Sequence, residues 1–186
     1  HVGQDVVINL DVRDFFPTVT LCRVFGVFQS LGYSPSIATI LALLCTELPV
    51  DKLELDGKTW YVARGERHLP QGGPTSPAIT NILCRGMDAR LAGIADKHGF
   101  EYTRYADDLT FSGGLDIVRL RPLIEKIVVE EGFALNVKKT RVMRRSGRQQ
   151  VTGLVVNDRV TVPRPWRRCL RAACHQMRLG RLTDET

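Results

Sequence analysis

The sequence of 186 residues predicts an α+β domain, in which an antiparallel sheet is covered by helices on one face. The first observation is the order of the expected elements, which runs strand, helix, helix, hairpin, helix, hairpin, helix and strands. The second is a short acidic link between two β-prone runs, because so short a link joins only antiparallel strands. The third is a hydrophobic content of 44%, which is enough for the core of one domain, or of one domain plus part of a second.

The front of the chain predicts one strand and two helices. Residues 6–11 (VVINLD) are strongly β-prone and end on an acid. A helix is expected over 20–31, capped by Thr18 or Thr20, because apolar residues recur there at i, i+3, i+4 and i+7. A second helix is expected over 35–47, since a proline lies in its first turn.

The middle of the chain predicts a hairpin and a longer helix. Residues 49–68 are polar, and the turn at 55–58 (LDGK) is followed by the aromatic return strand at 60–62. The segment at 69–77 (LPQGGPTSP) is rich in turn residues. A helix is expected from its end to about residue 97.

The last third predicts one more helix, several strands and a basic terminal helix. The amphipathic stretch at 117–131 favours a helix, with Pro122 in its first turn or at a bend. Short β-prone runs indicate strands over residues 133–137, 140–144, 150–156 and 159–162. The helix at 163–180 is basic, and the one plausible domain boundary falls at 157–163.

The charge of the chain is unevenly distributed. The net charge is +6, but residues 138–186 hold 13 Lys and Arg against 3 Asp and Glu, whereas the remainder is mildly acidic. A basic segment beside acids suits a protein that handles a polyanion near a metal. The alternative is a solvated basic surface.

The composition also limits the location of the protein. The sequence has no apolar run of about 18 residues and no signal-peptide layout, so we expect no membrane segment. The chain begins without a methionine, as if it were cut from a longer protein. The five cysteines form no CxxC pair and have no metal-ligand spacing with histidine, which favours buried free thiols in a reducing compartment and disfavours a zinc site.

Two adjacent acids, Asp107 and Asp108, lie between β-like runs at 100–104 and 109–112, at the tip of the expected hairpin. Ala106 is poorly suited to such a tight turn, so we expect local strain. If the first strand is a neighbour in the same sheet, Asp11 joins the pair. Three carboxylates suit Mg²⁺, and two such ions serve in-line phosphoryl transfer. Considered alone, Asp-Asp in a loop is more often a solvated acidic turn.

The motif at residues 9–17 (NLDVRDFFP) resembles the first catalytic motif of bacterial reverse transcriptases, most closely the retron-type group, with group II intron enzymes as relatives. The resemblance implies that Asp11 binds both metals and that Val12 lends a backbone carbonyl. It also implies that the backbone at Asp14 and Phe15 meets the nucleotide triphosphate. Phe16 matches the aromatic gate that crowds a ribose 2′-hydroxyl; ordinary core packing is its alternative.

Two further motifs carry the same resemblance. In residues 69–77, Gln71 and Gly72 match positions that lie against the incoming nucleotide. The segment at 102–112 (YTRYADDLTFS) is similar to the family's YxDD hairpin. By this likeness Asp107 is the principal metal ligand and Asp108 the lesser acid, while Tyr105 presses on the primer end or the template.

The later blocks agree with the family. Lys139 matches a lysine near the triphosphate or leaving group, and Gly153 lies in the block that includes the primer-gripping hairpin. The basic run resembles the first thumb helix, so Arg164, Arg167 and Arg168 are expected to meet backbone phosphates. A surface lysine and a solvated basic face are the alternatives.

The resemblance implies a polymerase palm over residues 1–157 and the start of a thumb over 158–186, with its first helix and without fingers. It implies an RNA-directed DNA polymerase with three catalytic acids (Asp11, Asp107 and Asp108), two Mg²⁺ per site and Mn²⁺ as a substitute. The expected partners are an RNA template, a DNA or RNA primer and deoxynucleoside triphosphates, in the bacterial cytoplasm. The fragment alone is expected to be inactive.

Two other functions fit the same motifs. One is a catalytically idle, reverse-transcriptase-like module that binds nucleic acid or protein, and the other is an RNA-templated RNA polymerase. The intact acids disfavour the first and Phe16 disfavours the second. Retrons, antiviral defence, intron mobility and CRISPR association share these motifs, so the sequence leaves the biological role open.

Overall fold

The computed structural model describes residues 1–179, and its centre is a four-stranded sheet in the order β4-β5-β1-β6. These strands are Val6–Asp11 (β1), Glu101–Tyr105 (β4), Asp108–Gly113 (β5) and Arg141–Arg144 (β6). Each neighbouring pair is antiparallel. The predicted antiparallel sheet is therefore confirmed, and the first strand lies directly beside the acidic hairpin.

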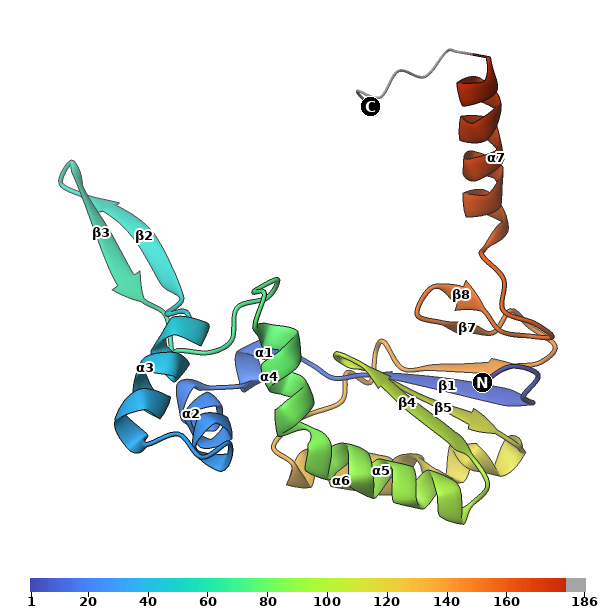
Figure 1. Cartoon of the computed structure of the whole chain (residues 1–186), viewed down its shortest axis with the longest axis horizontal. Coiled ribbons are helices and arrows are strands. Elements are labelled where there is room, and N and C mark those ends of the chain that lie inside the picture. Colours follow the sequence, from blue (N-terminus) through green and yellow to red (C-terminus); the bar gives the residue numbers. More distant parts are fainter. Residues whose placement is uncertain (180–186) are drawn as a thin grey trace.

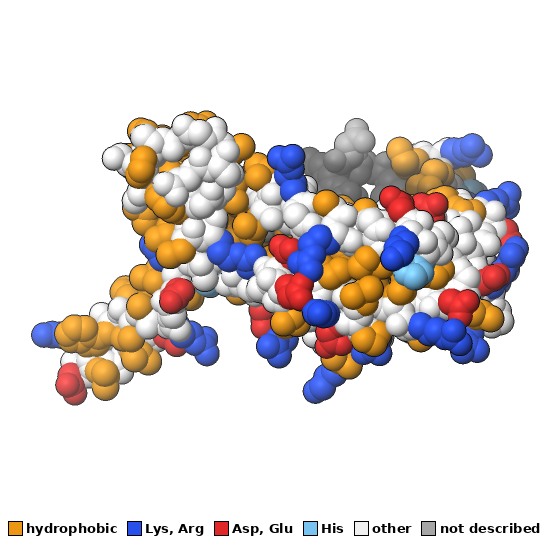
Figure 2. Space-filling model, turned by 90° about the horizontal axis from the view of Figure 1, so that it is seen from below, with side chains coloured by type: hydrophobic (Ala, Val, Ile, Leu, Met, Phe, Trp, Pro, Cys, Tyr) orange, Lys and Arg blue, Asp and Glu red, His pale blue; other side chains and the backbone are white. Residues whose placement is uncertain are grey.

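One face of the sheet is covered by helices, as Figure 1 shows for α5 (Arg85–Lys97) and α6 (Arg121–Glu130). The core lies between these layers and contains Ile8, Leu10, Met87, Leu91, Leu109, Phe111, Ile124 and Val128. The outer surface of the helices mixes charged and apolar side chains (Figure 2). The predicted arrangement of helices on one face is therefore confirmed.

Two predicted helices are each divided in the structure. Residues 76–97 form α4 (Ser76–Leu83) and α5, which are divided at Cys84, where ψ is 1° and departs from the helical value. The helix expected over 117–131 is a 3₁₀ segment, η1 (Leu115–Leu120), followed by α6. Pro122 lies in the first turn of α6, where it costs no hydrogen bond.

The other face of the sheet carries a very short hairpin. Strands β7 (Gln150–Val151) and β8 (Leu154–Val155) are joined by Thr152 and Gly153, whose φ values are 47° and 84°. The prediction of one strand over 150–156 is therefore wrong. A small apolar cluster that includes Val7 fixes this hairpin on the sheet.

Two further predicted strands do not form. Residues 133–137 contribute only an isolated bridge from Leu135 to Val12, and residues 159–162 only one from Thr161 to Val155. The first segment instead enters a turn, in which the N–H of Lys139 donates to the carbonyl of Asn136 at 3.0 Å. Residues 133–137 therefore do not form a strand despite their β-prone composition, because the chain turns after Asn136.

Residues 15–63 form a lobe beside the sheet (Figure 1). It contains α1 (Phe15–Thr18), α2 (Leu21–Ser30), α3 (Pro35–Cys45), β2 (Val50–Leu55) and β3 (Lys58–Ala63). The two helices and the hairpin were predicted, whereas the short α1 was not. Every residue of β2 and β3 is exposed, including Trp60 at 55%. Helix α3 also exposes apolar side chains, with Leu44 78% exposed.

Helix α7 (Arg164–Arg178) projects away from the sheet and has no buried residue (Figure 1). Its Trp166 is 72% exposed. The predicted end of this helix at Gly180, and the rest of the thumb segment to residue 186, lie outside the described residues. Within residues 1–179, no helix has the length and apolar character needed to cross a bilayer.

All five cysteines lie in the described part and are free thiols. Cys84 is buried, and burial raises the pKa of its thiol to about 11. Cys22, Cys169 and Cys174 are exposed, so the prediction of buried thiols is wrong for these three. Two of them lie on α7, which has no buried residue.

Candidate active site

Three carboxylates meet at one end of the sheet. Asp11 ends β1 and lies directly opposite Asp108, the first residue of β5. Asp107 precedes it in the turn, and its carbonyl accepts a hydrogen bond from the N–H of Val12 at 2.9 Å. The carbonyl of Asp11 accepts one from the N–H of Asn136 at 2.7 Å. Backbone contacts thus fix the chain at each of the acids.

The turn that carries the acids is strained, as expected. Ala106 has a φ of 51°, in the left-handed region that costs a residue with a Cβ about 1 kcal/mol. The turn is short because Tyr105, the last residue of β4, is already paired with Asp108, the first residue of β5. This geometry places Asp107 at the tip of the hairpin.

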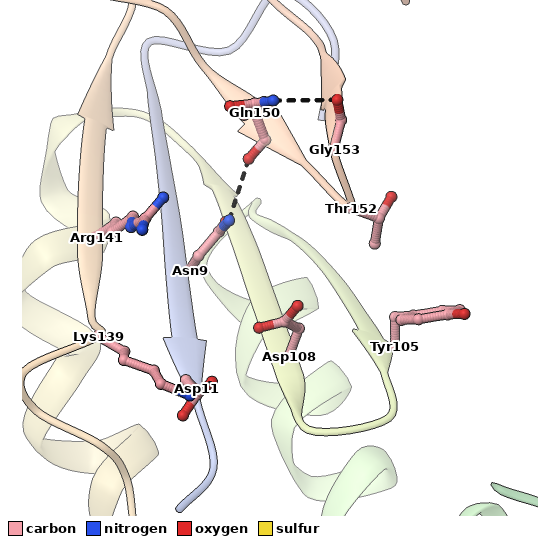
Figure 3. A pocket seen from close by; sticks show the side chains of 9 residues that line it. All are labelled: Asn9, Asp11, Tyr105, Asp108, Lys139, Arg141, Gln150, Thr152 and Gly153. Atoms are coloured by element: carbon pink, nitrogen blue, oxygen red, sulfur yellow. Dashed lines mark hydrogen bonds and ion pairs between the residues drawn. The ribbon is translucent and has the colours of Figure 1, made fainter. Parts of the chain in front are cut away.

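A cavity of about 750 Å³ opens beside the acids (Figure 3). Figure 3 shows Asp11 and Asp108 on adjacent strands, with Lys139 reaching toward Asp11. The lining comprises Asn9, Asp11, Tyr105, Asp108, Lys139, Arg141, Gln150, Thr152 and Gly153. The cavity therefore joins the acids to the β7–β8 hairpin across the open face of the sheet.

The acids repel one another. Burial, followed by the negative charges of Asp107 and Asp11, holds the pKa of the Asp108 carboxyl above its ordinary value. Lys139 and Arg141 act in the opposite direction on the same carboxyl. The side chain of Asp108 is therefore harder to ionise than an ordinary aspartate.

Lys139 compensates part of this charge. Its Nζ lies 3.1 Å from Oδ1 of Asp11, whose side chain is only 13% exposed. The hydrogen bond to Asp11, together with the charges of the three acids, raises the pKa of the Lys139 ammonium. Lys139 is therefore protonated and remains a donor beside the acids.

The donor set fits a hard divalent cation. Carboxylate oxygens come from Asp11, Asp107 and Asp108, and within residues 1–179 no hydrogen bond reaches the neighbouring carbonyl of Val12. The described residues contain no ready cage of three or more His, Cys, Asp or Glu side chains. Such an open site suits an ion that takes its remaining ligands from water and substrate phosphates. A cation would also remove the repulsion at Asp108.

The residues after Asp11 have different surroundings. Phe15 is only 3% exposed and packs against Phe16 and Phe133, with both pairs of ring centroids 5.3 Å apart. The Phe15 side chain therefore belongs to the core, and only the backbone of this residue is available for the predicted contact with a nucleotide. Phe16 is half-buried at the edge of the core. Asp14 has a φ of 46°, and its carbonyl accepts from the N–H and hydroxyl of Thr18.

Several residues predicted to bind substrate lie apart from the cavity. Gln71 and Gly72 are exposed in the loop before α4 and do not line it. That loop is tight, because a Cβ on Gly73 would lie 2.7 Å from Cγ of Pro70. The arginines predicted to contact backbone phosphates lie on α7, away from the sheet (Figure 1): Arg164, Arg167 and Arg168.

The cavity also contains residues that the sequence did not single out. Asn9 could have been found, since it lies two positions from Asp11 on β1 and therefore shares its face. Arg141 is the first residue of β6 and follows the turn that contains Lys139, so strand alternation does not connect the two. Gln150 and Thr152 depend on the β7–β8 hairpin, which forms in a segment predicted as a single strand. Asn9 connects these parts, because its amide donates to the carbonyl of Gln150 at 3.1 Å.

An antiparallel sheet on helices, with three acids at one end of a central strand pair, defines a palm of the kind that nucleic-acid polymerases use. Solved structures agree on this fold. Telomerase from Candida tropicalis has a TM-score of 0.61 over 85% of this chain and 35% of that protein, at 12% identity. Telomerase from Candida albicans has a TM-score of 0.54 over 86% of this chain and 30% of that protein, at 13% identity.

The chain belongs to the family described as reverse transcriptase (RNA-dependent DNA polymerase), whose model matches residues 1–164. It is 49% identical to the retron Mx65 reverse transcriptase of Myxococcus xanthus, over 95% of this chain and 42% of that protein. It is 35% identical to the retron Ec86 reverse transcriptase of Escherichia coli, over 99% of this chain and 53% of that protein. The predicted resemblance to retron-type enzymes is confirmed. The chain spans about half the length of these relatives, and the family uses divalent metal ions.

Proposed function

We propose that the protein containing this chain is a retron-type RNA-directed DNA polymerase of the bacterial cytoplasm. It extends a DNA or RNA primer on an RNA template with deoxynucleoside triphosphates. The main support is the pairing of Asp11 with Asp108 across β1 and β5, with Asp107 in the adjoining turn, in a chain of this family. We assign residues 1–157 to the palm and those from 158 onward to the start of the thumb.

Two Mg²⁺, with Mn²⁺ as a substitute, would be held by Asp11, Asp107, Asp108 and the carbonyl of Val12. When bound, they lower the pKa of the attacking 3′-hydroxyl and neutralise charge on the leaving pyrophosphate. Asp11 and Asp108 line the cavity, whereas Asp107 lies outside its lining in the adjoining turn, so substrate phosphates and water can reach the site to complete the coordination.

The other residues bind and orient the substrates. The ammonium of Lys139, which is kept protonated beside Asp11, is placed to donate to the triphosphate. Phe16 excludes the ribose 2′-hydroxyl, and the loop with Gln71 and Gly72 approaches the nucleotide when the template is bound. Tyr105 and Gly153, which both line the cavity, contact the primer end. The arginines of α7 contact backbone phosphates.

Primer extension by the full-length protein on an RNA template tests this proposal. Asp107→Asn and Asp108→Asn should each lower the rate by about 10²–10³-fold, because each removes a charge that acts on the transferring phosphate. Asp116→Asn is the matched control, since Asp116 is 77% exposed on η1 and pairs with Arg119. Chelation of the divalent cation should abolish extension by the wild type.

The catalytically idle binding module is the second candidate. It is favoured by the Lys139–Asp11 ion pair, which compensates one acid without any metal. Equal extension by the wild type and Asp107→Asn, or no extension by either, would support this candidate and overturn the polymerase.

A further inference from the structure

One ion pair joins helix α5 to the acidic hairpin. Arg104 of β4 donates from Nε and Nη2 to Oδ1 and Oδ2 of Asp88 on α5, at 2.8 and 2.7 Å. The Arg104 side chain is only 6% exposed. Tyr102, on the same face of β4, donates from its hydroxyl to Asp88 at 2.8 Å. A two-pronged, charge-assisted contact of this kind fixes the orientation of both partners.

Arg104 also reaches the strained turn. Its Nη1 donates to the carbonyl of Ala106 at 3.3 Å. The next carbonyl along the chain, that of Asp107, accepts from the N–H of Val12. Both carbonyls of the turn are therefore held, one by a side chain that is anchored on α5 and the other by the end of β1.

We propose that Asp88 and Arg104 are positioning residues, which hold the Ala106–Asp107 turn so that the carboxylates of Asp107 and Asp108 keep the geometry required for polymerisation. This inference rests on the proposed function. It assigns the pair a task beyond stability, because the turn adopts an unfavourable backbone conformation only where its surroundings enforce it.

The task is geometric rather than electrostatic. The cations that favour ionisation of Asp108 and lower its pKa are Lys139 and Arg141, on the other side of the site. The charge of Arg104 is compensated by Asp88, against which its guanidinium lies. A lysine at position 104 would keep the charge but lack the planar fork that makes all three contacts. Charge retention alone should therefore not preserve the turn.

The kinetic test compares Arg104→Lys, Arg104→Gln and Asp88→Asn in the full-length protein, with primer extension measured over a Mg²⁺ titration. Each variant should lower kcat by about 10²-fold, as expected for misplaced reacting groups, and raise the Mg²⁺ concentration for half-maximal rate. The nucleotide KM should remain near the wild-type value. The double variant Asp88→Asn/Arg104→Gln should be no slower than the slower single variant, because both changes break one unit.

Arg90→Gln is the matched control. Arg90 lies on the same helix as Asp88, is 42% exposed, and pairs with Glu130, the last residue of α6, and with the following Glu131 rather than with the hairpin. It should retain wild-type kcat and Mg²⁺ dependence. Wild-type values in Arg104→Lys would overturn the proposal. The proposal would also be overturned if the loss of kcat in each variant equalled its unfolded fraction, measured by thermal melting, while the Mg²⁺ concentration for half-maximal rate stayed unchanged.

A second measurement does not need polymerase activity. Amide hydrogen exchange of residues 105–108 should accelerate about five- to tenfold in Arg104→Gln, while the amides of β1 and α5 exchange as in the wild type. Unchanged exchange in the turn would overturn the positioning role. If the wild type fails to extend a primer, the proposed function falls, and hydrogen exchange still decides whether Arg104 holds the turn.

Discussion

Phe16 shows how one residue can combine a packing role with a substrate role. Its ring meets Phe15 edge-on, and Phe15 occupies the core position, so Phe16 remains half-buried at the edge. A side chain in this position can be shortened without opening a large internal cavity. The proposed gate can therefore be tested without unfolding the protein.

Phe16→Ala should raise the use of ribonucleotides relative to deoxynucleotides by at least about tenfold, because the 2′-hydroxyl no longer meets an aromatic ring. The ratio of kcat/KM values for the two triphosphates measures this. Phe28→Ala is the control, since Phe28 is another half-buried phenylalanine and meets the ring of Tyr33 edge to face within the lobe. An unchanged ratio in Phe16→Ala would exclude the gate.

The raised pKa of Asp108 makes a prediction about stability in the absence of divalent cations. A carboxyl whose pKa is higher in the folded state costs stability above that pKa, and the cost disappears as the pH falls through it. Asp108→Asn should therefore melt at a higher temperature than the wild type at pH 7 in a chelator. The difference should shrink on acidification.

Added Mg²⁺ provides the converse of this experiment. It should raise the melting temperature of the wild type more than that of Asp108→Asn, because ligand binding stabilises the state that binds. Circular dichroism melting curves at two pH values, with and without Mg²⁺, measure both effects. A variant that melts below the wild type in the chelator at pH 7 would contradict the repulsion.

At the scale of elements, prediction succeeded where the signal was local. Strand β1 and the hairpin at 101–113 stand out by composition, and their pairing brings Asp11 to Asp108 as inferred. The strand pattern missed the β7–β8 hairpin, because strands of two residues leave no alternating pattern, although the family resemblance implied a hairpin in this block. Its cavity residues, Gln150 and Thr152, were missed with it. The Asp88–Arg104 pair was missed because it joins residues of a helix and a strand that no motif links.

Helix α7 allows a prediction of its own. Arg167→Gln and Arg168→Gln should each weaken binding of a primer–template and reduce the slope of log affinity against log salt by about 1, because each removes one phosphate contact. The effect should not depend on nucleotide sequence. Arg119→Gln, an 85% exposed arginine on η1, is the control. Salt titrations of binding by fluorescence anisotropy would detect the change, and an unaltered slope would remove α7 from the interface.

At the scale of the whole molecule, the sheet and its helices form the packed part, and three appendages extend from it. The β2–β3 hairpin, one side of α3 and all of α7 leave apolar side chains in water. The three acids Asp11, Asp107 and Asp108 all come from the central sheet and its β4–β5 turn. Within residues 1–179, the apolar side chains of the appendages are left uncovered, although all three acids lie in the packed part.

We therefore expect residues 1–186 alone to extend a primer at least about 10²-fold more slowly than the full-length protein, because substrate positioning supplies at least that factor. The two proteins should be compared at equal concentration on one RNA template with a DNA primer. Comparable rates would show that the packed part and its appendages suffice.

The two tryptophans of the chain both lie on appendages, Trp60 on β3 and Trp166 on α7. Each is more than half exposed, so the intrinsic fluorescence of the folded chain should resemble that of indole in water. The emission wavelength should therefore change little when the core unfolds. It should shift toward the blue when a binding partner covers Trp60 or Trp166. The chain thus carries two natural optical probes of docking, and replacing Trp60 or Trp166 by phenylalanine assigns the signal to one of them.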